Sequence, residues 1–537
     1  MGQRSSDTRE ERHRRTMQPS QSPGPPHAPL VEVLQLELAP PSLADNTADL
    51  DRLLRALRRQ GFEPIQVRLA DADEFAARIR GENFHVTVLV GFFGSHWEIV
   101  DILPGSSSPT PLGLAIDLGS STIGLFFIDL ADRKTVAGTS IPNPQAEYGE
   151  DILSRLLFAR ARGNRKILQR IVIGGINRAI RETLENLGRS LSDLCAVTVA
   201  GNTVMSHFFL GLDPANLFKE PYIPAVNHFP TFRGKDSTLA MHPRGPVYVF
   251  PNAGSYLGGD LIAGVLACGM HRTEEISLLA DVGTNAEVVL GNREWLVACA
   301  GAAGPALEGG ALERGMPAAP GAIDRVRIDP ATFEPDFHVL GDVKPSGICG
   351  SGVIDLIAEM FRARLLTRQG KLSSPPGCRR VVHTEDGPAY VLADPDRTAD
   401  EKELLITETD VEVFLKSKAA MYAMLNVAVK KVGIRFDDVR HFYVAGAFGE
   451  SIDPAMAVRI GMIPDLPMET FHRMGNTAAA GAAMLLVDRD LLKDMEKACG
   501  RITYVELNVN AEFMDEFRSA LFLPHTSRRL FPSVNVP

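Results

Sequence analysis

The chain has 537 residues, 45% hydrophobic and 23% charged, with a formal net charge of −10. At ~150 residues per domain, this indicates a multidomain globular protein. No segment approaches the ~18–20 uncharged apolar residues of a membrane span, and the N-terminus lacks the apolar stretch of a secretory signal, so we expect neither a membrane protein nor an exported one. The acidic balance disfavours nucleic acid as a partner, because nucleic-acid binding usually needs a basic face.

Six cysteines are scattered along the chain, at Cys195, Cys268, Cys299, Cys349, Cys378 and Cys499. They form no C-x-x-C pair, zinc-ribbon spacing or ferredoxin run, so we expect no iron–sulfur cluster within this chain, although a cluster shared between subunits stays open. Single thiols in apolar surroundings are typical of reduced residues in a cytoplasmic protein.

The N-terminal part divides into a tail, a small domain and a joint. Residues 1–27 are charged and Pro-rich, which predicts a disordered tail. Residues 28–103 predict a small α+β domain, with strands in VEVLQLEL (31–38) and HVTVLVG (85–91) and a helix over the leucines of 50–57. The run PGSSSPTP at 104–111 predicts a flexible joint.

From residue 112 onward, apolar strand-like runs alternate with amphipathic helices, which predicts an α/β body. The spacing of apolar residues predicts one helix over 168–187 and another from about Thr409 through AMYAMLNVAVKKVG. Residues 365–405 are polar and contain Pro, Gly and Asp, so we expect an irregular surface excursion there.

Two similar turns are the most informative feature. The run LGLAIDLGSSTIGLFFIDL (112–130) places Asp117 and the turn Gly119–Thr122 between two apolar strands, and LLADVGTNAEVVLG (278–291) does the same with Asp281 and Gly283–Asn285. Glycine lets backbone amides approach a ligand, and successive turn amides form an anion-binding concavity. An Asp beside bound phosphates can coordinate Mg²⁺ directly or through water.

Either turn alone is equally typical of an ordinary hairpin whose Asp caps backbone amides. The presence of two copies, each at a strand–turn–strand junction, favours a polyphosphate site, since two facing turns can hold a polyphosphate from both sides as phosphoryl transfer requires. A third run, RHFYVAGAFGESIDP (440–454), predicts a strand that ends in the Gly-rich turn Gly446–Gly449, suited to a base and ribose but also to a plain strand-to-helix turn.

This order of motifs resembles the superfamily of acetate and sugar kinases, heat-shock chaperones and actin. The corresponding segments are phosphate 1 at 115–130, connect 1 at about 251–270, phosphate 2 at 278–291, adenosine at 442–450 and connect 2 at 475–488. The resemblance implies an α/β fold of two RNase H-like lobes, 112–270 and 271–537, with ATP and Mg²⁺ in the cleft and hinge motion between open and closed forms.

Several longer stretches resemble the ATP-dependent reductive activators of corrinoid proteins. They are IPNPQAEYGEDILSR (141–155), VAGNTVMSHFFLG (199–211), AGPALEGG (303–310), GMPAAPGAI (315–323), SGICGSGVIDLIAE (346–359) and TETDVEVFLKSKAAM (407–421). The small N-terminal domain, with PPSLADNTADLDRLLRAL (40–57), resembles that family's linker domain. The resemblance implies ATP-driven transfer of an electron from an iron–sulfur centre to the Co(II) corrinoid of a methyltransferase system.

The chain departs from that family in one respect. Members with this linker usually carry a plant-type ferredoxin domain before it, whereas residues 1–27 contain no cysteine. The electron donor is then a separate ferredoxin-type protein, or the redox role has been lost.

The superfamily resemblance also implies residue roles. Asp117 and Asp281 are the expected catalytic residues that coordinate Mg²⁺, Asp281 directly or through water. Asp260, on the connect 1 segment, would orient the attacking water or simply cap a helix. The expected nucleotide-binding residues are Gly119, Ser120, Ser121, Thr122, Gly283, Thr284, Asn285, Gly446, Ala447, Phe448 and Gly449. Cys349, in the Gly-rich GICGSG, fits small-residue packing or, alternatively, a redox or cobalt contact. Asn143, Tyr148 and Arg155 match a family motif without an assignable chemistry.

Three functions follow from these motifs. The first is an ATPase that activates a corrinoid protein with electrons supplied by another protein, as a homodimer according to the family resemblance. The second is a small-molecule kinase, and the third is a nucleotide-switched binding protein on the same fold. Stimulation of ATP hydrolysis by a Co(II) corrinoid protein, phosphoryl transfer to a metabolite, and client capture without net chemistry distinguish the three.

Overall fold

The computed structural model describes residues 28–536 apart from 150, 284, 303, 305, 307–309, 386 and 508–510. The tail predicted at 1–27 lies outside the described residues. The chain divides into two compact units, one reaching to Ala267 and including Thr477–Gly500, the other covering Cys268–Asn476 and the chain from Arg501 onward. Among the helices described, none combines the length and the apolar character needed to cross a membrane.

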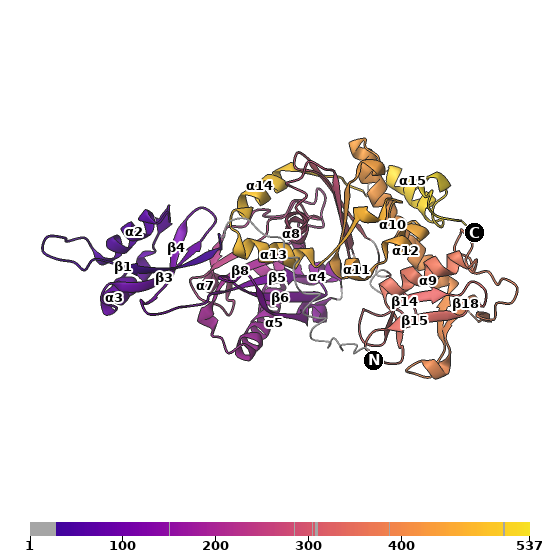
Figure 1. Ribbon diagram of the computed structural model, residues 1–537, viewed down its shortest axis with the longest axis horizontal. Coiled ribbons are helices and arrows are strands. Elements are labelled where there is room, and N and C mark those ends of the chain that lie inside the picture. The colour runs from indigo at the N-terminus through magenta and orange to yellow at the C-terminus, as the bar shows by residue number, and fades with distance from the viewer. Residues whose placement is uncertain are drawn as a thin grey trace, which may run out of the picture. The chain divides into compact units, whose positions relative to one another are not determined.

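The first unit begins with the predicted α+β domain. Its sheet has the order β1-β3-β4-β2 and is accompanied by two helices (Figure 1). The elements are β1 (Val31–Glu37), α2 (Asp49–Arg59), β2 (Ile65–Gln66), α3 (Leu69–Gly81), β3 (His85–Phe92) and β4 (Trp97–Pro104). Leu53 and Leu57 of α2 pack with Phe75 and Ile79 of α3 in a core of their own, so the helical leucine spacing at 50–57 identified a real apolar face.

The rest of the first unit is built on a six-stranded sheet of order β7-β6-β5-β8-β10-β9. Its strands are β5 (Leu112–Leu118), β6 (Thr122–Asp129), β7 (Thr135–Pro142), β8 (Leu194–Gly201), β9 (Phe232–Arg233) and β10 (Pro246–Val249). Strands β5–β7 form an antiparallel meander, while β8 and β10 run parallel to β5.

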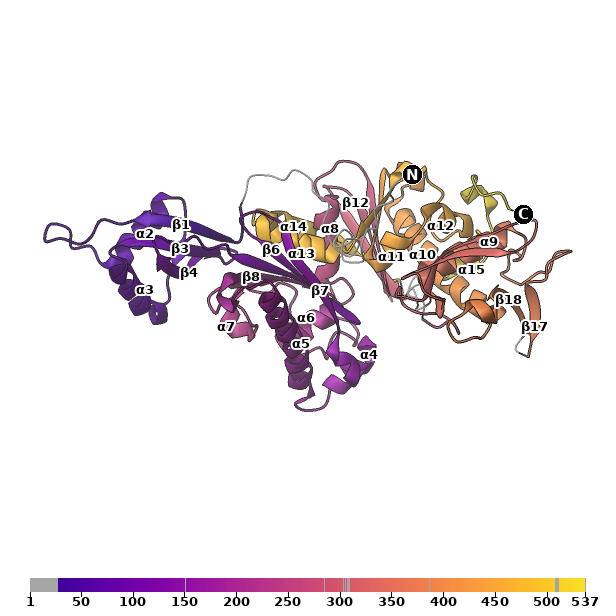
Figure 2. The ribbon, with the colours of Figure 1, turned by 60° about the horizontal axis from the view of Figure 1, so that its bottom comes forward.

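Helices cover both faces of this sheet, with α13 on one side and α5 on the other (Figure 2). The helices are η1 (Pro144–Tyr148), α4 (Ile152–Ala159), α5 (Asn164–Asn186), η2 (Leu191–Asp193), α6 (Thr203–Leu210), α7 (Gly234–Ser237), α8 (Gly259–Cys268), α13 (Thr477–Val487) and α14 (Leu491–Arg501). Gly481 of α13 allows close approach to α8, since an added Cβ would lie 2.1 Å from the carbonyl oxygen of Ala263. The connect 1 and connect 2 segments therefore touch each other.

A buried ionic cluster joins the small domain to the sheet of the same unit. The guanidinium of Arg233, 1% exposed, lies 2.7 Å from Asp71 and 2.5 Å from Glu98. Arg244 adds a second pair with Asp71 at 3.2 Å. Because charges removed from water are stable only when paired, these contacts fix the small domain to β9.

The second unit repeats the topology of the first in a sheet of order β21-β20-β11-β12-β13-β22. Its strands are β11 (Ser277–Val282), β12 (Asn285–Gly291), β13 (Leu296–Ala302), β20 (His441–Ala445), β21 (Phe471–Gly475) and β22 (Ile502–Tyr504). Strands β11–β13 form an antiparallel meander, and β20 and β21 run parallel to β11. Each unit thus contains the three-plus-two strand pattern of an RNase H-like lobe, which confirms the predicted fold.

The remaining elements surround this second sheet. The helices are α9 (Gly350–Arg362), η4 (Pro395–Arg397), α10 (Glu408–Val432), η5 (Phe436–Asp438), α11 (Gly446–Ser451), α12 (Pro454–Ile460), η6 (Met468–Thr470), α15 (Ala511–Ala520) and η7 (Arg528–Leu530). Two small sheets are formed by β14 (Ala322–Ile328), β15 (Pro335–Val339) and β16 (Gly347–Ile348), and by β17 (Val381–Thr384), β18 (Gly387–Ala393) and β19 (Leu404–Thr407). Helix α10 matches the helix predicted from about 409, with a capping box between Thr407 and Asp410.

The expectation of an irregular excursion at 365–405 is wrong, because β17, β18 and the start of β19 fall in it. The apolar residues of β18 are buried, and Tyr390 donates a hydrogen bond from Oη to the Phe333 carbonyl at 3.0 Å. The strands carry short apolar runs, VVHT, GPAYVLA and LLIT, but the polar residues, Pro and Gly between them dominate the composition of the segment.

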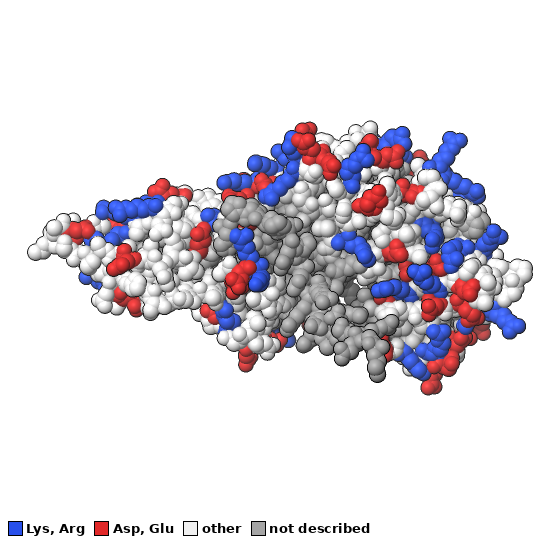
Figure 3. All heavy atoms as spheres, viewed as in Figure 1, with Lys and Arg blue, Asp and Glu red and all other residues white. Residues whose placement is uncertain are grey.

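Charged side chains of both signs are interspersed on the face seen in Figure 3, where blue and red groups alternate over the described surface. No patch of a single sign dominates the described surface on this face.

Candidate functional site

The first predicted turn lies at the carboxyl end of β5. Half-buried Asp117 pairs in register with Gly124 across the β5–β6 hairpin, and an added Cβ on Gly124 would lie 3.6 Å from Cβ of Asp117. The turn is tight at Gly119, where a Cβ would sit 2.4 Å from the Thr122 carbonyl oxygen. Only glycine fits at this position without moving the turn.

The carbonyl oxygens of this turn are held by two buried side chains. Asn143 Nδ2 donates to the Gly119 carbonyl at 2.9 Å, and its backbone N–H donates to the Ser121 carbonyl at 2.8 Å. Arg155 Nη1 donates to the Ser120 carbonyl at 2.7 Å, while its Nε holds Gly149 at 2.7 Å. Both side chains are almost completely buried, at 1% and 0% exposure.

These contacts determine what the turn presents to a ligand. Within the described part of the chain, the backbone N–H groups of Gly119, Ser120 and Ser121 have no hydrogen-bond acceptor. Burial lowers the pKa of Arg155, which nevertheless stays far above neutrality as an arginine, so a fixed positive charge lies behind the turn. The turn therefore has the features of an anion-binding site: its carbonyl groups are held by Asn143 and Arg155, its N–H groups are available to a ligand, and the Arg155 guanidinium is close by.

Asp260 lies at the same edge of the first sheet. Gly258 packs against the end of β8, because an added Cβ would lie 2.4 Å from Cα of Asn202. Strand β8 is the parallel neighbour of β5, with Gly201 in register with Leu118. Asp260 is inside the first turn of α8, where its Oδ1 accepts the Leu261 N–H at 2.8 Å, so it is not the cap residue itself.

Burial raises the pKa of Asp260 to about 6, against two opposing backbone hydrogen bonds. A carboxyl group with a pKa close to the working pH suits the orientation of a water molecule and acceptance of its proton. The first unit therefore brings Asp117, its turn and Asp260 to one sheet edge.

The second turn lies at the carboxyl end of β11. Half-buried Asp281 is directly opposite Glu287 in the β11–β12 hairpin, which puts two carboxylates on one face beside the turn. Gly283 N–H donates to the Asn285 carbonyl at 2.8 Å and closes the turn. Thr284 lies outside the described residues. Glu287 was not identified from the sequence, although its place across the hairpin from Asp281 was readable from the spacing in DVGTNAE.

Gly446 joins the adenosine-like segment to this turn. Strand β20 runs parallel to β11, and Asp281 is in register with Ala445. Gly446 has a φ of +83°, and an added Cβ would lie 2.8 Å from Oδ1 of Asp281. Both its left-handed backbone and the neighbouring carboxylate therefore require glycine. Gly449 is similarly restricted by the Val444 carbonyl, whereas the side chains of Ala447 and Phe448 lie outside the described residues.

The donor chemistry in each unit fits a magnesium–nucleotide complex. Asp117 in one unit and Asp281 with Glu287 in the other offer hard oxygen ligands of the kind Mg²⁺ prefers. Asp117 is followed by the turn at Gly119, and Asp281 adjoins Gly446; neither glycine leaves room for a side chain. In the described residues there is no group of three or more His, Cys, Asp and Glu side chains able to hold a metal alone. Such a site would need phosphate oxygens and water to complete it.

Cys349 serves the packing of the second unit. It is 2% exposed, and its thiol lies 3.4 Å from both the Ile323 carbonyl and Oγ of Ser351. These contacts favour the packing interpretation of the GICGSG turn over a cobalt contact.

Comparisons with known proteins give a consistent picture. Residues 25–109 match the RACo linker region, residues 112–273 the RACo middle region, and residues 275–535 the C-terminal domain of RACo, the ASKHA domain. The chain is similar to a solved "Reductive activator for corrinoid,iron-sulfur protein", with 36% identity and a TM-score of 0.88, covering 96% of this chain and 82% of that one.

Two curated relatives carry related names. The "Corrinoid activation enzyme RamQ" of Eubacterium limosum is 27% identical over 524 residues, 95% of this chain and 86% of the relative. The "[Co(II) methylated amine-specific corrinoid protein] reductase" of Methanosarcina barkeri is 26% identical over 420 residues, 73% of each chain.

Proposed function

The chain belongs to the family of reductive activators of corrinoid proteins, and from this premise we propose that it hydrolyses ATP to drive reduction of a Co(II) corrinoid protein of a methyltransferase system. The partner class comes from its relatives, whose names specify corrinoid activation and a Co(II) corrinoid protein. These names favour reductive activation over a small-molecule kinase.

The observation that carries the ATPase part is the duplicated Asp–Gly turn. Each RNase H-like lobe ends its first strand with an Asp followed by a glycine turn. In the first unit Gly119 leaves no room for a side chain, and the N–H groups of Gly119, Ser120 and Ser121 have no protein acceptor among the described residues. We assign the amides of Gly119–Thr122 in the first turn and of Thr284 and Asn285 in the second to the β- and γ-phosphates, and Gly446–Gly449 to the adenosine. The Gly283 N–H instead closes the second turn on the Asn285 carbonyl.

Asp117 and Asp281 are the proposed ligands of Mg²⁺, with Glu287 beside the second. Bound there, the ion would neutralise charge on the phosphate oxygens and hold them in line for attack. We assign Asp260 the role of orienting the attacking water. The raised pKa of its carboxyl group allows it to accept a proton from that water. Arg155 and Asn143 are positioning residues that keep the turn amides aimed at the phosphates.

We propose that the electron comes from another protein. The proposal assigns it to a separate ferredoxin-type donor in the cytoplasm, where thiols and clusters remain reduced. A one-electron step of 59 mV uphill costs a factor of ten in equilibrium, or ~1.4 kcal/mol, which a nucleotide-driven conformational change can offset. We further propose that the active species is a homodimer.

The test is ATP turnover in Asp117→Ala and Asp281→Ala, with circular dichroism and thermal melting as checks on folding. Both variants should lose Mg-ATP hydrolysis while melting like the wild type, because both residues are half-buried beside turns. Asp213→Ala, which removes a carboxylate 66% exposed at its side chain, is the control and should turn over normally. Full turnover in both turn variants would refute the assignment.

A further inference from the structure

Helices α4 and α5 of the first unit carry an excess of positive charge on their exposed side. They lie side by side, joined by a short loop, and α5 packs its apolar side against the six-stranded sheet (Figure 2). From Ile152 to Arg181 the sequence contains eight Arg and Lys residues and no Asp or Glu, although the whole chain has a net charge of −10. Arg155 is buried behind the first turn, and the other seven are Arg160, Arg162, Arg165, Lys166, Arg170, Arg178 and Arg181.

The charge is concentrated where α4 meets α5. We define the basic patch as Arg160, Arg162, Lys166 and Arg170, which are all exposed. Within the part of the chain that the structure describes, none of these four side chains has an ion-pair or hydrogen-bond partner. The neighbouring Arg165 forms an ion pair with Asp213 at 3.8 Å and is therefore not counted in the patch.

The far end of α5 is balanced. Glu182 lies four residues after Arg178, and Glu185 lies four residues after Arg181. Opposite charges at this spacing on a helix attract each other. These two arginines are therefore also left out of the patch.

Three carboxylates precede α4 in the sequence, at Glu147, Glu150 and Asp151. Asp151 is the N-cap of α4 and accepts hydrogen bonds from the N–H and the hydroxyl of Ser154, at 2.7 and 2.8 Å. The length of α4, about 12 Å, separates Asp151 from Arg160, and this exceeds the Debye length of ~8 Å in physiological salt. The four cations of the patch outnumber these three carboxylates.

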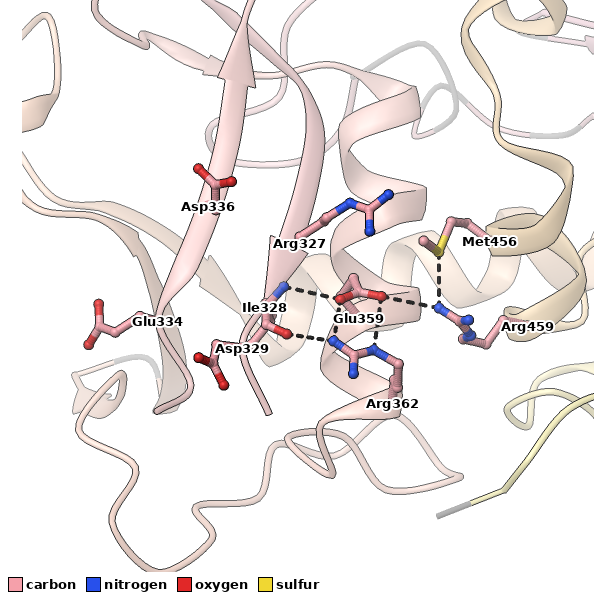
Figure 4. Close-up of a pocket in the computed structure, with 9 residues that line it drawn as sticks. All are labelled: Arg327, Ile328, Asp329, Glu334, Asp336, Glu359, Arg362, Met456 and Arg459. Atoms are coloured by element: carbon pink, nitrogen blue, oxygen red, sulfur yellow. Dashed lines mark hydrogen bonds and ion pairs between the residues drawn. The ribbon is translucent and has the colours of Figure 1, made fainter. Parts of the chain in front are cut away.

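The charged cavity of the second unit differs from the patch because its charges balance (Figure 4). Its charged lining residues are Arg327, Arg362 and Arg459 with Asp329, Glu334, Asp336 and Glu359. Asp336 lies opposite Arg327 in the β14–β15 register, and Glu359 accepts hydrogen bonds from the other two arginines. The residues that line this cavity leave no excess of positive charge for a partner.

The cations at the start of α5 do not stabilise the helix that carries them. Its first turn contains Arg165 and Lys166 and no acidic residue, and the N-cap Gly163 makes no side-chain hydrogen bond. The N-terminus is the positive end of the helix dipole, so cations placed there cost stability, whereas Asp or Glu would add to it. A stabilising role within the fold therefore does not account for them, and contact with an anionic partner does.

Two exposed leucines of α4 adjoin the patch. Leu153 and Leu157 are 58% and 52% exposed and lie one turn apart on the same side of α4. Arg160 follows Leu157 by three residues, which places it on the same side. Apolar side chains flanked by unpaired charges suit contact with another protein, because the apolar contact adds affinity and the charges orient the partner.

We propose that the basic patch, with Leu153 and Leu157, is the docking surface for an acidic iron–sulfur protein that serves as the electron donor, an inference that rests on the proposed function. A [2Fe–2S] cluster with four thiolate ligands carries a charge of about −2, and about −3 once it has accepted an electron. Electron-transfer encounters bury less than about 1,200 Å² and are steered by charge. Four cations beside two leucines fit such an encounter.

Other occupants fit this surface less well. A second copy of the chain in a two-fold contact would place the patch against itself, cation facing cation. A long polyanion such as nucleic acid would extend over the acidic remainder of the chain.

The test is calorimetric titration of the full chain with an oxidised plant-type [2Fe–2S] ferredoxin. One ferredoxin per chain is expected, with a Kd that rises at least about tenfold between about 50 and 300 mM NaCl, because salt screens exposed charges. Arg162→Glu and Arg170→Glu should each weaken binding about fivefold or more, since each replaces an attraction with a repulsion. Arg59→Glu is the matched control: it reverses an exposed arginine at the end of α2 in the small domain and should change the Kd less than about twofold.

ATP hydrolysis without any protein partner separates this inference from the proposed function. It should be unchanged in Arg162→Glu and Arg170→Glu, because neither residue belongs to the nucleotide site. A wild-type chain that hydrolyses ATP but does not bind the ferredoxin, or binds it equally well after both reversals, would overturn the docking surface and leave the proposed function standing.

Two further probes identify a different occupant. Vesicles of phosphatidylcholine with about 30% phosphatidylserine should bind more weakly than the ferredoxin. Tighter vesicle binding that Arg170→Glu removes would overturn the proposal in favour of a membrane surface. Loss of Co(II) corrinoid protein binding in Arg170→Glu, with ferredoxin binding retained, would overturn it in favour of the corrinoid partner.

Discussion

Asn143 and Arg155 fix the backbone of the first turn. The hydrogen bonds that they make go to turn carbonyls and not to a nucleotide. Each donates to turn carbonyls across 24 to 35 residues of chain. Such contacts depend on the tertiary fold, and the sequence alone showed a motif at these positions without a chemistry. Asp117 and Gly119, by contrast, were predictable, because a strand, an acid and a glycine turn follow one another locally.

Asn143→Ala tests this positioning role. Loss of the bond to Gly119 should lower kcat/KM for ATP about tenfold or more, corresponding to ~1.4 kcal/mol of lost transition-state stabilisation. Asn164→Ala is the matched control, since Asn164 also donates from Nδ2 to a carbonyl at 2.9 Å, that of Phe158, but not in the turn. The measurement is steady-state ATPase kinetics of both variants, with melting temperatures measured to show that both are folded. Unchanged kinetics in Asn143→Ala would contradict the positioning role.

Substitution of Gly446 allows the effect of backbone strain on stability to be separated from the effect of the Asp281 contact on nucleotide binding. Gly446→Ala should destabilise by about 1–2 kcal/mol, the cost of a non-glycine left-handed residue, and should also displace Asp281, abolishing nucleotide binding. Gly433→Ala carries the same strain at φ +77°, yet nothing lies within 4 Å of its added Cβ. Gly433→Ala should therefore melt lower but bind ATP normally. Equal ATP affinity in the two variants would disprove the contact with Asp281.

Asp260 predicts a pH dependence. Its folded pKa of about 6 lies above the ordinary aspartate pKa of 3.8, so between these pH values the native state binds more protons than the unfolded chain. This group's contribution to stability is full below the unfolded pKa and falls as pH rises through about 6. Asp260→Asn should thus gain stability relative to wild type at pH 7.5 more than at pH 4.5, while losing ATP hydrolysis and keeping ATP binding. A stability difference independent of pH would show that the carboxyl group is not shifted.

At the scale of elements, the apolar runs before each Asp predicted β5 and β11 correctly, and the helical spacing predicted α2, α5 and α10. Strand β18 contains the apolar run AYVLA and was readable from the sequence, but the Pro, Gly and charged residues around it dominate the composition of 365–405. Helix α3 was not predicted because Phe75 and Ile79 are its only large core-facing apolar side chains, and the third buried position of its face is Asp71.

The ionic cluster at Arg233 makes a prediction about how the small domain is attached. Arg233→Met should destabilise the first unit by ~3–5 kcal/mol, because Asp71 and Glu98 would stay buried without their main cationic partner. Arg78→Met removes a comparable pair with Asp101 that is 40% exposed on the arginine side, and should cost ~1 kcal/mol or less. The chain has two tryptophans, so in a Trp295→Phe background the fluorescence of Trp97 reports unfolding of this domain. Similar losses in both arginine variants would contradict the burial argument.

At the scale of the whole molecule, the chain contains one RNase H-like topology twice, each copy bearing its acid and its turn at the same strand end. The duplication was visible in the sequence because both turns are local. Helices α8 and α13, which carry the connect 1 and connect 2 segments, touch through Gly481. The start of that domain is tied to the end of α13, as Leu30 N–H donates to the Leu486 carbonyl at 2.9 Å.

The central claim is that ATP hydrolysis on the paired turns drives an electron onto a Co(II) corrinoid. The most direct measurement is the visible absorbance of a Co(II) corrinoid protein mixed with this chain and a reduced ferredoxin-type donor, followed with ATP, with a non-hydrolysable analogue and with no nucleotide. The account predicts Co(I) only with ATP and the wild-type chain, and none with Asp281→Ala. Formation of Co(I) at the same rate without ATP, or ATP hydrolysis that leaves the cobalt at Co(II), would contradict it.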